Sequence, residues 1–157
     1  MNTVSLAYRF RQKFGVAAKD AFDWCTDFGP KDGSLFSTPV RRTVKWVNDS
    51  TLVMTDTKQV DGKTVRIARL VRILPSELAW TNTHLNGPYR HSQFWYRIVA
   101  DGPRRSHLEF TGLAIREVPG RVSTSARSRL AEGLRKDDAA EWRTRLAPAL
   151  ESDLARN

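Results

Sequence analysis

The chain has 157 residues, of which 40% are hydrophobic, a proportion that excludes an intrinsically disordered protein and can fill the core of one domain spanning residues 1–157. Its 26 Lys and Arg residues outnumber 17 Asp and Glu residues, giving a formal net charge of +9. No segment approaches the roughly 20 apolar residues of a membrane span, and the first residues (MNTVSLAYRF) lack the features of a secretion signal. The single cysteine, Cys25, excludes an internal disulfide, so we expect a soluble, cytoplasmic protein.

The basic residues are spread along the chain rather than concentrated in one region. The local clusters are short, at residues 41–42, 104–105 and 127–136, and the last of them also contains Glu132. Such dispersal is typical of a solvated surface and argues against a nucleic-acid partner, although a basic interaction module for nucleic acid or an acidic partner is retained as an alternative. Three separated histidines and one cysteine lack the spacing of a metal site, so neither a metal nor a cofactor is expected.

The first predicted elements are a strand and a short helix. Apolar residues occupy every second position from Val4 to Phe10, which predicts a half-buried strand. From Ala17 to Cys25 the apolar residues recur at helical spacing. Residues 29–38 begin with a Gly-Pro pair, which ends this helix and predicts a loop.

Six strand-like segments follow, separated by turn signals. They cover approximately residues 39–48, 51–60, 63–73, 77–85, 91–100 and 106–117. The Asp61-Gly62 pair is the strongest hairpin signal in the chain. Because all the connections are short, consecutive strands are expected to pair in antiparallel fashion.

A long helix is predicted to close the chain. Leucines from Leu130 to Leu154 lie along one side of it, and residues 123–125 offer an N-cap. Residues 136–138 and Pro148 are candidate positions for a break or a kink. The element order predicts an α+β fold in which a curved, seven-stranded antiparallel sheet wraps around this helix, the only large element left to cover the sheet.

The hairpin registers predict which side chains share the inner face of the sheet, because side chains alternate between faces with a period of two. The turn at residues 61–62 sets Asp56 opposite Ile67, and the next turn sets Val71 opposite Trp80. The remaining predicted pairs are Arg69–Asn82, Ile67–His84, Trp80–Tyr96, Asn82–Phe94, Tyr96–Phe110 and Phe94–Gly112. Gly112 is expected to leave space for Phe94 or for the long helix.

The predicted inner face is apolar except for a polar cluster toward one end. The candidate ligand-binding residues are Arg42, Met54, Asp56, Arg69, Val71, Trp80, Asn82, His84, Phe94, Tyr96 and Phe110. The cluster is compatible with a structural ion pair of Asp56 with Arg69 and Arg42, or with a group that orients a ligand in an apolar cavity. In a further alternative, large side chains fill the interior completely; these are Trp46, Trp80, Phe94, Phe110 and Trp142.

Several segments resemble the START-like (SRPBCC) superfamily. Residues 17–28 (AAKDAFDWCTDF) are similar to its first helix, with the Thr-Asp-aromatic ending at Phe28. Residues 71–80 (VRILPSELAW) resemble its strand-Pro-strand turn, and the Gly-Pro turn at residues 87–88, the strand at residues 94–99 and the closing helix also match. The resemblance covers nearly the whole chain. It implies a helix-grip fold shared with polyketide cyclases, pollen-allergen-like proteins and lipid-transfer domains.

The expected function is binding of a hydrophobic or aromatic small molecule, lipid- or polyketide-like, in an internal cavity, as carrier or sensor, by a monomer or homodimer. An enzyme is the alternative: a polyketide cyclase or dehydratase that uses the polar end of the same cavity, without metal or cofactor. In that interpretation His84 is the general base and Tyr96 the acid. Asp56 orients the reacting groups, and Arg69 stabilises the developing oxyanion.

Overall fold

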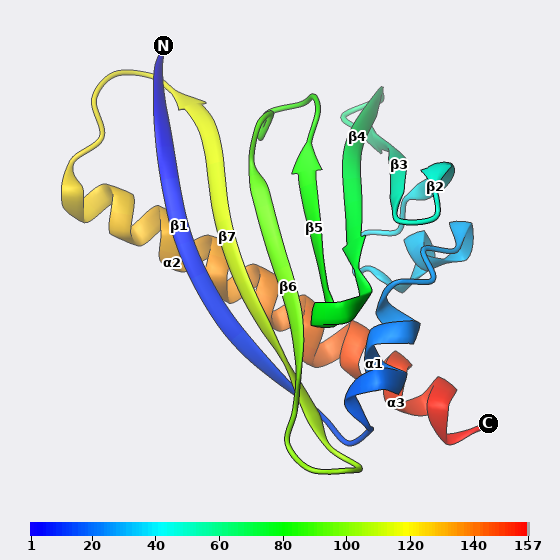
Figure 1. Cartoon of the computed structure of the whole chain (residues 1–157). Coiled ribbons are helices and arrows are strands. Elements are labelled where there is room, and N and C mark those ends of the chain that lie inside the picture. The colour runs from blue at the N-terminus through cyan, green and yellow to red at the C-terminus, as the bar shows by residue number, and fades with distance from the viewer. Residues whose placement is uncertain (157) are drawn as a thin grey trace.

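The computed structural model describes residues 1–156 and shows a curved sheet packed against a long C-terminal helix (Figure 1). The elements in chain order are β1 (Asn2–Phe14), α1 (Ala18–Cys25), the 3₁₀ helix η1 (Pro30–Leu35), β2 (Arg41–Asn48), β3 (Thr51–Val60), β4 (Lys63–Leu74), the 3₁₀ helix η2 (Pro75–Glu77), β5 (Ala79–His84), β6 (Gln93–Ala100), β7 (Ser106–Val118), α2 (Thr124–Glu141), the π-helical segment η3 (Trp142–Leu146) and α3 (Ala147–Ala155). All the strands form one antiparallel sheet in the order β1-β7-β6-β5-β4-β3-β2. The predicted α+β architecture is confirmed.

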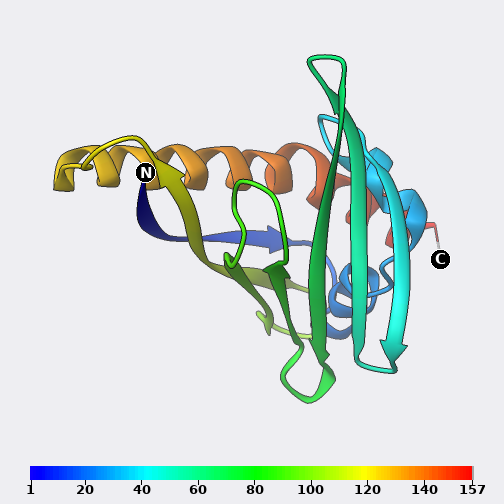
Figure 2. The ribbon, with the colours of Figure 1, turned by 90° about the horizontal axis from the view of Figure 1, so that it is seen from above.

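The sheet bends strongly around α2. Figure 2 shows β1 and β7 running alongside this helix, whereas β2, β3 and β4 stand across its line. The helix begins as predicted: the Ser123 Oγ accepts a hydrogen bond from the Ala126 amide at 3.1 Å, satisfying a donor of the first turn. The space enclosed by the bent sheet and the helices contains the core.

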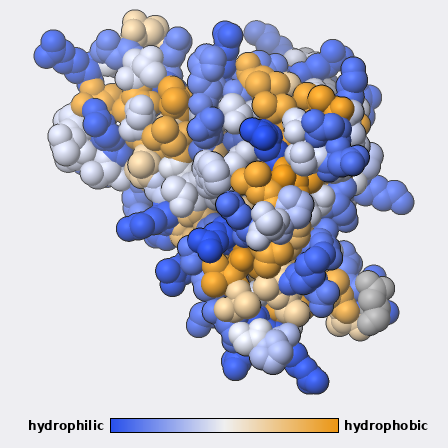
Figure 3. Space-filling view, in the orientation of Figure 1, coloured by the Kyte–Doolittle hydropathy of each residue, from blue (hydrophilic) through white to orange (hydrophobic). Residues whose placement is uncertain are grey.

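Two apolar clusters fill most of that space. One joins α1 and the end of the long helix to the middle of the sheet, through fully buried side chains such as Leu52, Leu108 and Leu150. The other joins β1, β6 and β7 to α2, around Leu6 and Phe110. The opposite face of the sheet meets solvent, and in Figure 3 hydrophilic and apolar side chains are interspersed over it.

All the predicted strand registers are confirmed except that of β4 with β5, which is wrong by two residues. Asp56 pairs with Ile67 as predicted, and the β5–β6 and β6–β7 pairs are also as predicted. However, Val71 lies opposite Asn82 rather than Trp80. Residues 75–77 form a 3₁₀ turn and Leu78 adopts the left-handed conformation (φ 49°), so the hairpin closes at Leu74 and Ala79. A shift of two keeps every side chain on its predicted face.

The long helix contains a π-helical segment that ends two residues before Pro148. The Ala147 amide donates to the carbonyl of Trp142, five residues earlier, instead of the usual four. Proline has no amide hydrogen and crowds the carbonyl four residues before it, and the wider turn accommodates both effects. The predicted irregularity at Pro148 is therefore present, whereas the predicted one at residues 136–138 is absent, since α2 continues through them.

Two predictions about interior space have different outcomes. A Cβ on Gly112 would lie 2.9 Å from the Phe110 ring, 3.0 Å from Tyr8 and 3.1 Å from Phe94, so the glycine does leave room for aromatic side chains. In contrast, Trp46 does not fill the interior. It lies on the edge strand β2, beside a break in register, and is 46% exposed.

Candidate functional site

A cavity of about 490 Å³ lies between the inner face of the sheet and the helices. Its wall includes ten of the eleven candidate ligand-binding residues: Arg42, Met54, Asp56, Arg69, Trp80, Asn82, His84, Phe94, Tyr96 and Phe110. The eleventh, Val71, is fully buried in the core and is not part of the wall. The large aromatic side chains therefore line an open space rather than closing it.

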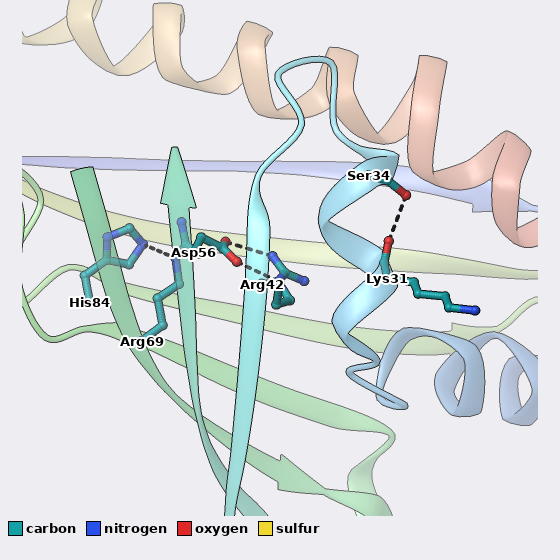
Figure 4. Close-up of polar contacts among 6 residues, drawn as sticks. All are labelled: Lys31, Ser34, Arg42, Asp56, Arg69 and His84. Atoms are coloured by element: carbon teal, nitrogen blue, oxygen red, sulfur yellow. Dashed lines mark hydrogen bonds and ion pairs between the residues drawn. The ribbon is translucent and has the colours of Figure 1, made fainter. Parts of the chain in front are cut away.

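The polar end of the cavity is an Arg–Asp–Arg–His network that crosses four adjacent strands (Figure 4). Asp56 on β3 accepts hydrogen bonds from Nε and Nη2 of Arg42 on β2, at 2.7 and 2.9 Å. It also accepts one from Nη1 of Arg69 on β4, at 2.5 Å. The Nε of Arg69 in turn donates to Nε2 of His84 on β5, at 3.2 Å. The observed register, which sets Arg69 opposite His84, produces this last contact.

Asp56 is held in its ionised form. Burial alone raises the pKa of its carboxyl group, but the hydrogen bonds and charges of Arg42 and Arg69 outweigh burial and hold this pKa below its ordinary value. The side chains of Arg42 and Asp56 are 5% and 6% exposed, so the pair is nearly removed from solvent. Two guanidinium groups against one carboxylate leave this end with one net positive charge.

His84 is neutral near pH 7. Burial and then the charge of Arg69 lower its pKa to about 4, against an opposing effect of Asp56. Because Nε2 accepts the hydrogen bond from Arg69, the proton of the neutral ring resides on Nδ1. His84 therefore contributes a donor at Nδ1, while its acceptor nitrogen is already in use.

Several polar atoms at this end lack a protein partner among residues 1–156. The Oδ1 of Asn82 is buried and accepts no hydrogen bond. Nη1 of Arg42 and Nη2 of Arg69 donate to none of these residues. Buried polar groups are nearly always paired, so the unpaired Asn82 oxygen marks a place for a polar atom of a ligand, and the two free guanidinium nitrogens belong to residues of the same cavity wall.

Aromatic rings form the apolar wall. Trp80 and Tyr96 stack with their centroids 4.9 Å apart and their planes within 3° of parallel. Phe110 meets Tyr96 edge-on at 5.2 Å, and Phe94 continues the row. On the other side, the Arg42 guanidinium lies 5.3 Å from the centroid of Phe36, which follows η1. The guanidinium of Arg42 is therefore held by Asp56 through its nitrogens and by its contact with the Phe36 ring.

A second polar pair in the wall was not predicted as part of the site. Tyr8 on β1 donates a hydrogen bond to Oδ2 of Asp138 on α2, at 2.5 Å, and both residues line the cavity. The alternation of β1 does predict that Tyr8 points inward. Asp138, however, was interpreted as part of a helix break. Ser92, which is fully buried near the start of β6, exchanges hydrogen bonds with the backbone of Ile115 and does not join the polar network.

The loop that contains η1 supplies further wall residues that the sequence did not identify. They are Asp32, Leu35, Phe36, Thr38 and Val40. The loop is tied to α2 because the amide and hydroxyl of Ser37 donate to the Glu141 carboxylate. Among residues 1–156, no group of three or more His, Cys, Asp or Glu side chains is arranged to hold a metal ion.

Solved structures with the same architecture identify the fold. The aromatase/cyclase Zhui from Streptomyces sp. R1128 matches with a TM-score of 0.73 at 11% identity, over 98% of this chain and 95% of that chain. A START superfamily protein from Mycobacterium smegmatis matches with a TM-score of 0.67 at 15% identity, over 93% and 97%. The chain has the START-like, helix-grip fold. A third helix-grip protein, norcoclaurine synthase from Thalictrum flavum in complex with dopamine and hydroxybenzaldehyde, matches with a TM-score of 0.66 at 12% identity, over 99% and 89%.

At these identities the likeness establishes the helix-grip fold and no more. No protein-family model matches the chain, and no curated protein matches it in sequence. None of the helices within residues 1–156 has the length and apolar character needed to cross a membrane.

Proposed function

We propose that this helix-grip chain binds an aromatic or otherwise hydrophobic small molecule, lipid- or polyketide-like, in its cavity, as a carrier or sensor. The observation that carries the proposal is a cavity of about 490 Å³ that combines a stacked aromatic wall with unpaired polar atoms at one end. Small-molecule sites usually enclose about 300–1,000 Å³ and have mostly apolar walls with a few polar groups that fix orientation. The cavity has each of these properties.

The chemistry of the polar end indicates which part of the ligand it receives. Nη1 of Arg42 and Nη2 of Arg69 are free donors in a region with one net positive charge. A carboxylate, or a carbonyl oxygen that carries partial negative charge, matches such donors better than a cation does. The Oδ1 of Asn82, in the same cavity wall, has no donor among residues 1–156 and is an acceptor for a ligand hydroxyl. A ligand with an oxygen-rich end and an aromatic body therefore satisfies the site.

A pair of probes tests this proposal by calorimetry. 2-Naphthoic acid and 2-naphthalenemethanol share the same aromatic body, but only the acid carries a carboxylate. We expect the acid to bind about 10- to 100-fold more tightly, the range of a hydrogen bond to a charged group. Arg69→Met should remove this preference. Arg66→Met is the matched control, since Arg66 lies on the same strand but is exposed.

Two outcomes would contradict the proposal: neither naphthalene compound binds, or the preference for the acid survives Arg69→Met and falls with Arg66→Met. Native mass spectrometry of the freshly purified protein provides an independent measurement. An intact compound that is bound non-covalently and released by denaturation would support a carrier.

A polyketide cyclase or dehydratase remains the second candidate, because His84, Tyr96, Asp56 and Arg69 all line the cavity. The network gives these residues unequal support. The free Nη2 of Arg69 supports a role as oxyanion stabiliser, but His84 acts as a base only if Nε2 first releases Arg69. The pKa of Tyr96 is raised, first by burial and then by the charge of Asp138, so its hydroxyl stays protonated but is a weaker acid than that of an ordinary tyrosine. Unchanged turnover of His84→Ala in a cyclisation assay would remove His84 from such a mechanism.

A further inference from the structure

The cavity has a second polar end, formed by Tyr8 and Asp138 on the side of β1 and α2. The Tyr8 hydroxyl occupies only Oδ2 of the Asp138 carboxylate, at 2.5 Å. Oδ1 accepts no hydrogen bond from residues 1–156 and is not enclosed by them. Glu141, one turn further along α2, also lines the cavity, but its carboxylate is engaged by Ser37. Asp138 therefore presents an acceptor oxygen to the cavity.

The two polar ends carry opposite charge and are separated by the aromatic wall. The Arg42–Asp56–Arg69 end has one net positive charge, whereas the Tyr8–Asp138 end has a carboxylate and no cation within hydrogen-bonding distance among residues 1–156. Phe94 adjoins both ends, because its ring centroid lies 5.2 Å from that of His84 and 6.5 Å from that of Tyr8. Tyr96 also lines the cavity. The charge of Asp138 adds to burial in raising the pKa of its hydroxyl, while the charges of Arg69 and Arg42 lower it, so this hydroxyl is within electrostatic range of both ends.

We propose that Asp138, held in place by Tyr8, is a second recognition point for a hydrogen-bond donor on the ligand, so that the cavity selects aromatic acids that also carry a hydroxyl or ammonium group at the end remote from the acid. This inference rests on the proposed binding function and names its ligand class. Tyr8 fixes the orientation of the carboxylate, and its ring lies 5.5 Å from that of Phe110 and 6.5 Å from that of Phe94 (centroid to centroid), so the pair adjoins the aromatic wall. An N–H or O–H donor is the natural partner of a carboxylate oxygen that faces the cavity without a hydrogen bond.

Three probes with a common body test the inference by calorimetry at pH 7. 2-Naphthoic acid has only the acid, 6-hydroxy-2-naphthoic acid adds a hydroxyl, and 6-(aminomethyl)-2-naphthoic acid adds an ammonium group. For wild-type protein we expect at least one of the substituted acids to bind about 10- to 100-fold more tightly than 2-naphthoic acid. The substituted acid with the larger gain in affinity shows whether the Asp138 end prefers a hydroxyl or an ammonium donor.

Asp138→Asn should abolish this gain, because it removes the charge and keeps the shape; the affinity of the same variant for unsubstituted 2-naphthoic acid is the reference against which the gain is measured. Asp137→Asn is the matched control. Its side chain is exposed and lies outside the cavity wall, so the gain should persist. Tyr8→Phe keeps the carboxylate but removes the hydrogen bond that fixes its orientation, so the gain should be reduced without being abolished. This second variant keeps the test valid if Asp138→Asn is unstable.

The possible failures are distinguishable. If 2-naphthoic acid binds but neither substituent adds affinity, or if Asp138→Asn keeps the gain, the second recognition point is refuted and the proposed function stands. If none of the three acids binds wild-type protein, the proposed function fails and the inference fails with it. If Tyr8→Phe loses the gain while Asp138→Asn keeps it, the donor is recognised by the Tyr8 hydroxyl and not by Asp138.

Discussion

Replacing Asp56 with Asn should cost about 3–5 kcal/mol of stability, the range measured when one partner of a buried ion pair is removed. Asp56 accepts three charge-assisted hydrogen bonds, two from Arg42 and one from Arg69, and its side chain is 6% exposed. The substitution removes the carboxylate that both guanidinium groups bind, one of them buried (Arg42) and the other partly buried (Arg69). For a chain of this length, such a loss lowers the melting temperature by roughly 6–20 °C, which circular dichroism or calorimetry can follow.

Two comparisons determine whether burial of the network is the cause. Asp23→Asn applies the same change to an ion pair with Lys19 in which Asp23 is 55% exposed, and should cost no more than about 0.5 kcal/mol. The triple variant Arg42→Met, Asp56→Leu, Arg69→Met removes the whole network and should recover most of the stability lost by Asp56→Asn. The reasoning is refuted if Asp56→Asn costs no more than Asp23→Asn.

Two more predictions follow from the same geometry. His84 has a pKa of about 4 in the folded protein against 6.5 in an exposed histidine, so the unfolded chain binds the extra proton first; stability should fall by up to about 3 kcal/mol as the pH drops from about 6.5 to 4. Urea unfolding at several pH values should show this fall reduced in His84→Gln, and an identical pH profile for the variant would contradict the assignment. Gly112→Ala should destabilise by about 1–3 kcal/mol, because the added Cβ meets three aromatic rings. A melting temperature equal to that of wild type would show that the rings can move aside.

The registers that were predicted correctly are those set by local chemistry. Asp61 and Gly62 adopt positive φ values of 50° and 75°, as a tight hairpin turn between twisted strands demands, and this residue pair favours that conformation. Leu78 also has a positive φ, but nothing about a leucine predicts it. The local sequence therefore does not predict this turn conformation, and without it the register of β4 with β5 could not be predicted correctly.

The candidate site divides in the same way. Alternation along the strands correctly placed Arg42, Asp56 and Arg69 on one face, since a strand offers only two directions for a side chain. Asp138 was missed because a helix offers many directions, and which of them meets the cavity depends on how the helix sits on the sheet. The loop around η1 was missed because no periodicity describes it.

The π-helical segment at residues 142–146 also determines which side of α3 faces the rest of the protein. A π turn holds about one residue more than an α turn, which rotates everything after it by roughly 100° relative to α2. That rotation aims α3 so that Glu151 accepts from the Gly15 amide and Asp153 from the Trp24 indole. The extra residue of the π turn thus sets the angle between the side of α2 that faces the cavity and the side of α3 that binds Gly15 and Trp24. Deleting that residue would leave both surfaces intact in sequence while directing one of them away from its partners.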